Sequence, residues 1–149
     1  MSVWLKRSIW VILAVLILAQ AIRPSRTNPP TEPALDISAE SALPPATMAT
    51  LHRSCNDCHS NFTVWPWYSS VAPASWLLAY DVRAGRHEMN LSEWGNYTAE
   101  RRAKLAKEMC KEVTEGEMPG TMYTLMHSQA KLTSADVQTI CSWSQTAQK

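Results

Sequence analysis

Cys55, Cys58 and His59 form the group of residues whose types and spacing point most directly to a chemistry. In a CxxCH pattern, two thiols three positions apart can each form a thioether bond to one vinyl group of a porphyrin, and the adjacent imidazole can bind the iron. The pattern therefore predicts one covalently attached haem c, with His59 as the proximal iron ligand.

Two other chemistries use a CxxC pair. A thioredoxin-like dithiol needs a strand before the pair and a helix after it, and a zinc site needs a second Cys or His pair at short spacing. The chain before Cys55 is rich in proline, and the remaining cysteines, Cys110 and Cys141, are far from each other in sequence. Neither context is present, so the sequence favours haem.

The group opposite His59 decides how the haem would work. Met118 is the leading candidate, because Pro119 restricts the backbone next to it and Gly116 and Gly120 allow sharp turns on either side. A thioether ligand favours ferrous iron and raises the potential. His127 is the alternative ligand and would give a lower potential, whereas an open sixth position would allow a small ligand to bind.

The most direct function for such a haem is one-electron transfer, with an unidentified redox partner in the periplasm or the membrane. The alternative is a haem-based sensor or a minor haem enzyme with an open or displaceable sixth ligand. We expect an electron carrier rather than a catalyst, because no Arg and His pair suited to peroxide cleavage accompanies Met118. A net charge of +1 gives no reason to expect a nucleic-acid partner.

The N-terminal segment is typical of an export element. Lys6 and Arg7 precede an apolar run, and the sequence Ala19-Gln20-Ala21 resembles a cleavage site. The span from Val3 to Ile22 would also make about 30 Å of helix, enough for an uncleaved single-pass anchor. Residues 1–22 are therefore predicted to be a signal anchor or a signal peptide. The rest of the chain would then lie in the periplasm, anchored to the cytoplasmic membrane or, after cleavage, soluble.

Residues 23–46 contain six of the nine prolines and little apolar periodicity, so we predict a stiff, extended linker. The alternative is an irregular coat that lies on the domain, with Leu35, Ile37 and Leu43 in surface grooves. Residues 47–149 are predicted to form a single haem-binding domain.

The domain is predicted to be all-α, a small c-type cytochrome-like fold around the haem. The expected helices cover residues 47–58, 74–87, 99–114 and a last segment that begins near Thr133. The loop from Ser60 to Pro73 contains too many turn-forming residues for a helix, and we expect it to wrap the haem. The aromatic side chains predicted to contact the cofactor are Trp65, Trp67, Tyr68 and Trp76.

Two predictions concern helix faces. Trp76 and Tyr80, and less regularly Leu77, are expected on the inner face of the second helix. Cys110 and Cys141 are expected on inner faces of the last two helices, and in an oxidising compartment they would be able to form a disulfide. Two buried free thiols are the alternative.

The chain resembles the bacterial haem-binding domain family. The resemblance is carried by Cys55-Asn-Asp-Cys-His59-Ser-Asn, Trp65-Pro-Trp-Tyr68-Ser, Ala72-Pro, Ser75-Trp76, Asn90-Leu-Ser-Glu-Trp94, Met118-Pro119, Tyr123 and His127. It extends from Arg23-Pro24 over most of the chain. The resemblance implies an α-helical domain with one CxxCH, held at the outer face of the cytoplasmic membrane by an uncleaved N-terminal helix. Ser128 stands where many relatives have proline.

Overall fold

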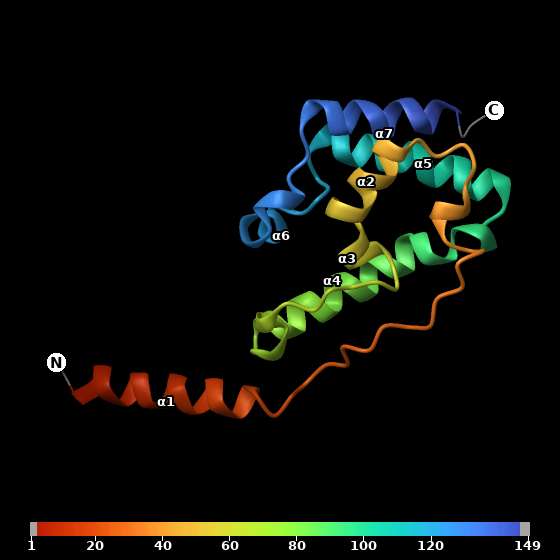
Figure 1. Ribbon diagram of the computed structural model, residues 1–149. Coiled ribbons are helices and arrows are strands. Elements are labelled where there is room, and N and C mark those ends of the chain that lie inside the picture. The colour runs from red at the N-terminus through yellow and green to blue at the C-terminus, as the bar shows by residue number, and fades with distance from the viewer. Residues whose placement is uncertain (1–2, 147–149) are drawn as a thin grey trace.

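The computed structural model describes residues 3–146. These residues fold into seven α-helices and four short 3-10 turns, with no β-strand among them, which confirms the predicted all-α class. The first helix, α1 (Val3–Ala19), extends away from the others in Figure 1, and residues 37–146 form the compact domain.

The helices of the domain form two layers (Figure 1). Helices α5 (Ala99–Glu115) and α7 (Ser134–Thr146) pack together as one layer, and α4 (Ala74–Glu88) forms the opposite layer. Between the layers lie α2 (Pro45–Ser54), which contacts α7, and α3 (Asn56–His59), which contacts α4. The short helix α6 (Thr121–Met126) lies at one end of the space between the layers.

The protein core lies on the α5–α7 side. Its largest fully buried side chains are Trp94 and Trp143, whose ring centroids are 5.9 Å apart, and they pack with Leu51, Leu91 and Ile140. Trp94 comes from the 3-10 turn η3 (Leu91–Asn96). Contact between rings of this size contributes much of the apolar area that a small domain can bury.

Helix α5 begins and ends where its sequence predicts. The hydroxyl of Thr98 accepts a hydrogen bond from the Arg101 N–H at 3.2 Å, and Gly116 takes a left-handed conformation with φ 76° at the C-terminal end. The inner face expected from the helical spacing of Leu105, Ala106, Met109, Cys110 and Val113 is buried except at Cys110, which is half-buried. Gly116 is needed here because a side chain would strain a backbone with positive φ.

Helix α7 begins at a reciprocal cap. The Asp136 N–H donates to the Thr133 hydroxyl at 3.2 Å, and the Thr133 N–H donates to the Asp136 carboxylate at 2.8 Å. A disulfide joins Cys110 of α5 to Cys141 of α7. The two helices of this layer are therefore linked both by packing and by a covalent bond.

The helix predicted over residues 47–58 is divided in two. Cys55 separates α2 from α3 with φ −122° and ψ −30°. Thr47 does not cap the helix as predicted, because α2 already begins at Pro45, and Pro at the first position needs no N–H partner. Thr47 is buried instead, and its hydroxyl lies 3.1 Å from that of Thr139 on α7.

Helix α4 has the predicted length, but its inner face was predicted incorrectly. The buried residues are Ser75, Leu78, Val82 and Gly85, whereas Trp76, Leu77 and Tyr80 are 37%, 51% and 59% exposed. Helix α3 packs against α4 most closely at Gly85, and this contact decides which side of α4 is buried. Leu77 is exposed because it lines the cavity described below. Hydrophobicity alone would have turned the larger residues inward.

The proline-rich segment is extended, but it lies along the domain rather than projecting from it (Figure 1). Asn28 is the main point of attachment: its amide donates to the Thr63 carbonyl at 3.0 Å and accepts from Arg86 at 2.8 Å. Further along, Ile37 and Leu43 enter the core. The segment therefore lies on the surface of the domain as irregular chain, the alternative to a free linker.

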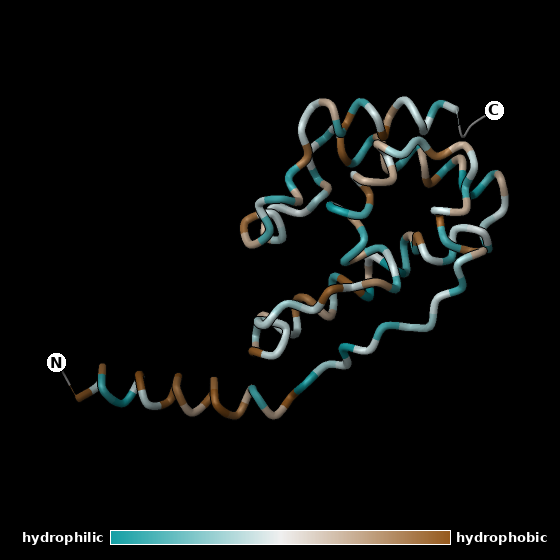
Figure 2. Tube along the Cα trace, viewed as in Figure 1, coloured by the Kyte–Doolittle hydropathy of each residue, from teal (hydrophilic) through white to brown (hydrophobic). Residues whose placement is uncertain are grey.

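Helix α1 is mostly apolar, with hydrophilic residues only near its N-terminal end, as the brown and teal stretches in Figure 2 show, and none of its residues is buried. It ends at Ala19, which makes it shorter than the anchor predicted from Val3 to Ile22. Within residues 3–146, no helix has the length and apolar character needed to span a membrane.

Candidate functional site

A cavity of about 850 Å³ lies between the two layers and brings together the residues singled out by the CxxCH motif. Cys55, Cys58 and His59 line it from the α2–α3 side, and Met118 lines it from the loop that follows α5. Pockets for cofactors and small molecules typically measure about 300–1,000 Å³, so this cavity has the capacity for a large cofactor. Met118 is far in sequence from the CxxCH motif, and the cavity brings the two together.

His59 is oriented for iron binding by a hydrogen bond from its ring. Its Nδ1 lies 3.1 Å from the Met89 carbonyl oxygen, and because a carbonyl can only accept, the hydrogen must be on Nδ1. The lone pair is then on Nε2, the usual arrangement for a histidine ligand whose other nitrogen is held by the backbone. Burial lowers the pKa of His59, which keeps the imidazole neutral.

Both cysteines of the motif are free thiols that favour the protonated form. Burial raises the pKa of Cys55 to about 12, and burial together with Asp81 and Asp57 raises the pKa of Cys58 to about 11. A dithiol oxidoreductase lowers the pKa of its attacking cysteine, so this environment does not suit thiol–disulfide exchange. Nor do residues 3–146 contain a cluster of three or more His, Cys, Asp or Glu side chains arranged to hold a metal ion.

Gly85 allows α4 to lie directly against the motif. A Cβ atom at this position would be 2.6 Å from the Cys58 carbonyl oxygen and 3.2 Å from the Cys58 Cβ. Any other residue would push α3 away from α4 and move both Cys58 and His59. Gly85 is thus a requirement of the site's geometry that the motif itself does not reveal.

The cavity wall has the mixed character that a porphyrin needs, with a large apolar area and few polar groups. The hydroxyl of Ser54 is buried at this wall and makes no hydrogen bond to the described residues. The apolar and sulfur-containing part of the wall comprises Leu77, Ala84, Met89, Leu105, Met109, Val113, Pro119 and Met122. These residues, with the two thiols and one neutral imidazole, fit a covalently held haem.

Charged side chains also line the cavity. They are Asp81, Glu88, Glu108 and Glu112 together with one lysine, Lys111. Lys111 lies 3.8 Å from Glu112, and burial raises the pKa of Asp81. Carboxylates therefore outnumber ammonium groups in the lining, and Lys111 is the lining residue that could pair with an acidic group of a bound cofactor.

Tyr123 of α6 connects the cavity wall to the CxxCH motif. Its hydroxyl donates to the Asp57 carboxylate at 2.7 Å, and its ring stacks on His127 with centroids 4.3 Å apart. Burial and the nearby carboxylate raise the pKa of Tyr123, so the phenol remains protonated and the hydrogen bond persists. Asp57 is one of the two variable positions of CxxCH, and here it ties the motif to α6.

Several residues expected at the cofactor lie elsewhere. The structure does not place Trp65, Trp67, Tyr68, Trp76 or His127 among the residues that line the cavity. The Trp65 indole N–H donates to Asn28 of the proline-rich segment, and the Trp76 indole N–H donates to the Ile22 carbonyl just before that segment. The Trp67 side chain is 76% exposed, and the Tyr68 hydroxyl lies 3.4 Å from His127.

A comparison with protein families agrees with this geometry. The profile described as "Haem-binding domain" matches residues 14–146, nearly the whole chain. The chain belongs to the haem-binding domain family. Searches of curated proteins and of solved structures found no similar protein.

Family membership supports haem as the cofactor of this domain, and the cavity indicates which residues of the haem-binding domain would hold it. No motif or spacing along the chain singled out Gly85, Met89 or Met109 for the site, and Tyr123 entered only through the family resemblance. Met109 lies on the helix predicted over residues 99–114, and helical spacing does not show that it faces a cavity. Met89 contributes its carbonyl group, which no sequence pattern reveals.

Proposed function

We propose that this domain binds one haem c covalently and serves in one-electron transfer. The observation that carries the proposal is that Cys55, Cys58, His59 and Met118 line one large, mostly apolar cavity. Cys55 and Cys58 would form the two thioether bonds, His59 would be the proximal ligand and Met118 the distal ligand. Haem bound in this way supplies an iron centre that cycles between the ferric and ferrous states.

The chain's own residues would serve this function by fixing the ligands. The Met89 carbonyl holds the ring of His59 in one tautomer, and Gly85 sets the spacing between α3 and α4. The apolar part of the wall would limit contact between the cofactor and water, a condition that favours the less charged ferrous state. No substrate pocket is needed for transfer of single electrons.

Covalent attachment is tested by replacing both cysteines, Cys55→Ala with Cys58→Ala. We expect the wild-type protein to retain haem stain after denaturing electrophoresis and the double variant to lose it. Cys110→Ala with Cys141→Ala is the matched control, because it removes the same number of cysteines and should keep the stain. Stain that survives in the Cys55 and Cys58 variant contradicts thioether attachment at this motif.

The distal ligand is tested by comparing Met118→Ala with His127→Ala. Met118 is 45% exposed and lines the cavity, whereas His127 stacks on Tyr123 outside the cavity wall. We expect Met118→Ala to give a high-spin ferric spectrum, a lower potential and new affinity for carbon monoxide. His127→Ala should change none of these, and the opposite pattern would identify a bis-histidine site.

Carbon monoxide also separates electron transfer from the alternative function, a haem-based sensor or minor enzyme. The partial exposure of Met118 and its place on a loop between α5 and α6 favour a ligand that can be displaced. Slow or absent binding of carbon monoxide to the ferrous wild-type protein agrees with electron transfer. Rapid binding would favour sensing.

We further propose that residues 1–22 direct the domain across the bacterial cytoplasmic membrane and hold it at the periplasmic face, where c-type haem is attached. The basic pair Lys6 and Arg7, in the first turns of α1 and before its apolar run, supports this location. Intact mass of the exported protein tests it. A mature chain that begins at Ile22 would show a cleaved signal peptide and a soluble periplasmic protein.

A further inference from the structure

The corner of the domain where α1 joins it combines apolar and cationic side chains that the haem site does not use. The Ala72 N–H donates to the Gln20 side-chain oxygen at 3.0 Å, and the Trp76 indole donates to the Ile22 carbonyl at 2.9 Å. These bonds fasten the C-terminal end of α1 to the region between the 3-10 turn η2 (Trp67–Ser70) and α4. The apolar surface of α1 therefore has a defined position relative to this corner.

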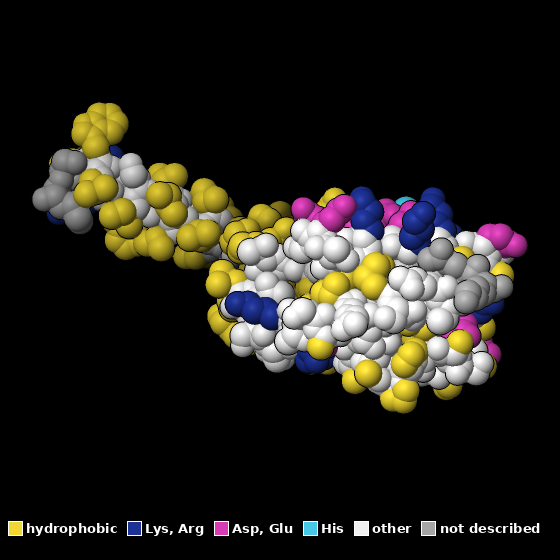
Figure 3. Space-filling view, turned by 90° about the horizontal axis from the view of Figure 1, so that it is seen from above, with side chains coloured by type: hydrophobic (Ala, Val, Ile, Leu, Met, Phe, Trp, Pro, Cys, Tyr) yellow, Lys and Arg dark blue, Asp and Glu magenta, His cyan; other side chains and the backbone are white. Residues whose placement is uncertain are grey.

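Exposed apolar side chains continue from α1 onto the domain. Figure 3 shows the apolar atoms of α1 followed by further apolar atoms on the nearest end of the domain. At this corner Trp67 is 76% exposed and Val71 is 45% exposed, and Trp76 and Tyr80 are also on the surface. Trp and Tyr have an apolar ring and a polar group, which makes them favourable at the boundary between lipid and water.

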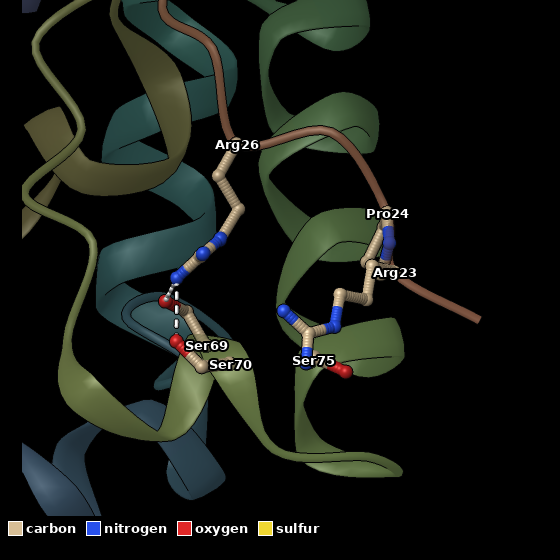
Figure 4. A pocket seen from close by; sticks show the side chains of 6 residues that line it. All are labelled: Arg23, Pro24, Arg26, Ser69, Ser70 and Ser75. Atoms are coloured by element: carbon tan, nitrogen blue, oxygen red, sulfur yellow. Dashed lines mark hydrogen bonds between the residues drawn. The ribbon is translucent and has the colours of Figure 1, made fainter. Parts of the chain in front are cut away.

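Two arginines lie beside these residues and are not neutralised by acids. Arg26 donates to the hydroxyls of Ser70 at 2.6 Å and Ser69 at 3.2 Å, and Arg23 reaches down beside Ser75, as Figure 4 shows. Neither arginine takes part in an ion pair within residues 3–146, and the residues lining this hollow include no carboxylate. The hollow measures about 20 Å³, so it has room for a small group only.

We propose that this corner lies against a lipid surface and that Arg23 and Arg26 bind the phosphate of an anionic phospholipid headgroup. Guanidinium groups bind phosphate through paired N–H donors, and the serine hydroxyls supply further donors. A hollow of about 20 Å³ can admit part of a phosphate group whose lipid remains outside the protein, but it is too small for a whole soluble metabolite. The proposal rests on the proposed membrane location, and it does not depend on how haem is attached.

Hydrogen exchange of the full-length, haem-loaded protein in lipid nanodiscs tests this proposal. The readout is the exchange rate of amides 67–80 in nanodiscs of phosphatidylcholine alone and of phosphatidylcholine with phosphatidylglycerol. We expect exchange to be slower with the anionic lipid by a factor on the order of ten, the size expected when two basic residues meet an anionic surface. Arg26 also has a structural role through Ser69 and Ser70, so its replacement could change the exchange rate without any lipid. The readout is therefore the ratio of the exchange rates in the two lipid compositions, measured for each protein.

Arg23→Gln with Arg26→Gln should bring this ratio close to one. The matched control is Lys104→Gln with Lys107→Gln, which removes the same charge from the exposed side of α5 and should leave the ratio unchanged. An unchanged ratio in the arginine variant, or a ratio of one in the wild type, overturns the proposal.

A phosphate group could come from a lipid headgroup or from a soluble anion, and inorganic phosphate distinguishes these two sources. In detergent without phospholipid, we expect phosphate and chloride at equal ionic strength to leave amides 67–80 equally exposed to exchange. Protection by phosphate alone, without any effect of phosphatidylglycerol, would assign the hollow to a soluble anion and reject the lipid surface. The haem stain of every variant is measured in parallel, so a failure of haem attachment is recognised separately.

Discussion

The α5–α7 side of the domain is filled by its own side chains, whereas the space between α5 and α4 holds a cavity of about 850 Å³. On the filled side, Trp94, Trp143 and Ile140 are at most 2% exposed, and a disulfide joins the two helices. On the cavity side, α6 has no buried residue, and Met122 and Leu125 are 66% and 72% exposed. The comparison indicates a domain with one self-supporting half and one half that a cofactor completes.

This division separates the determinants of stability from those of the site. Substitutions on the α5–α7 side should lower the free energy of unfolding and leave the haem spectrum of folded protein unchanged. Substitutions around the cavity should change the spectrum at a smaller cost in stability. The variants described next test this difference between the two sides. For each of them, the free energy of unfolding is measured on haem-loaded protein by denaturant unfolding.

The largest effect on stability is expected for Trp143→Ala. Truncation of a buried tryptophan leaves a large cavity and costs about 3–5 kcal/mol. The Trp143 indole N–H has no hydrogen-bond partner among the described residues, so its removal relieves a desolvation cost and we expect the lower end, about 3 kcal/mol. Trp67→Ala is the matched control, and because Trp67 is 76% exposed, a loss below about 1 kcal/mol is expected. Equal losses in the two variants would contradict the contrast.

Loss of the disulfide should have the next largest effect. Cys110 and Cys141 are 31 residues apart, and a bridge of that span contributes about 3 kcal/mol by restricting the unfolded chain. The variant Cys110→Ala with Cys141→Ala should unfold at lower denaturant concentration, while its absorption spectrum remains that of the wild type. A spectral change would show that the α5–α7 layer also controls the iron ligands.

Gly85→Ala tests the boundary between the two halves. The added Cβ would lie 2.6 Å from the Cys58 carbonyl, so α3 and α4 must separate at a cost of about 1–3 kcal/mol. Because Cys58 and His59 move with α3, we also expect a shift in the haem absorption bands. Arg83→Ala is the control, since Arg83 is exposed on the same helix and does not line the cavity. A Gly85→Ala protein with unchanged bands would mean that the site tolerates movement of α3.

The smallest effect concerns the pH dependence at Asp136, on the filled side. Burial alone would raise the pKa of Asp136, but hydrogen bonds from Thr133, Arg53 and Thr50 outweigh it and lower the pKa well below the usual range. A carboxyl group whose pKa is lowered by folding stabilises the fold above its unfolded pKa of about 3.9 and loses this contribution as pH falls through the folded pKa. We expect about 1–2 kcal/mol, the scale of hydrogen bonds to a charged group in a partly exposed setting.

Asp136→Asn provides the measurement for this prediction. The difference in unfolding free energy between wild type and Asp136→Asn should be largest near pH 7 and shrink progressively below about pH 4. Asp36→Asn is a useful control, because Asp36 caps a short turn in the proline-rich segment, away from this network. If the difference in unfolding free energy between wild type and Asp136→Asn stays constant with pH, the lowered pKa of Asp136 does not stabilise the fold.

The element boundaries that sequence predicts well are those with local causes. Thr98 and Gly116 mark the ends of α5, and Thr133 with Asp136 marks the start of α7, because a cap is formed by residues within a few positions of each other. The inner face of α4 was not predictable in this way. Trp76 and Tyr80 are aromatic yet partly exposed, since the close approach of α3 at Gly85 decides which face turns inward, whereas Leu77 is exposed to the cavity that it lines.

The amino-acid sequence by itself determined the chemistry that is available: two cysteines and a histidine in one short motif, a methionine beside a proline, and a helical pattern around them. Those properties are local, so they can be read from neighbouring residues. Only the tertiary structure decided which of these residues share one cavity, because Met118 and His59 are brought to the same space by α7, which packs against both α5 and α2. Likewise, the Trp65 and Trp76 indole N–H groups donate to Asn28 of the proline-rich segment and to Ile22 just before it rather than turning to the cavity, and no spacing along the chain encodes those contacts.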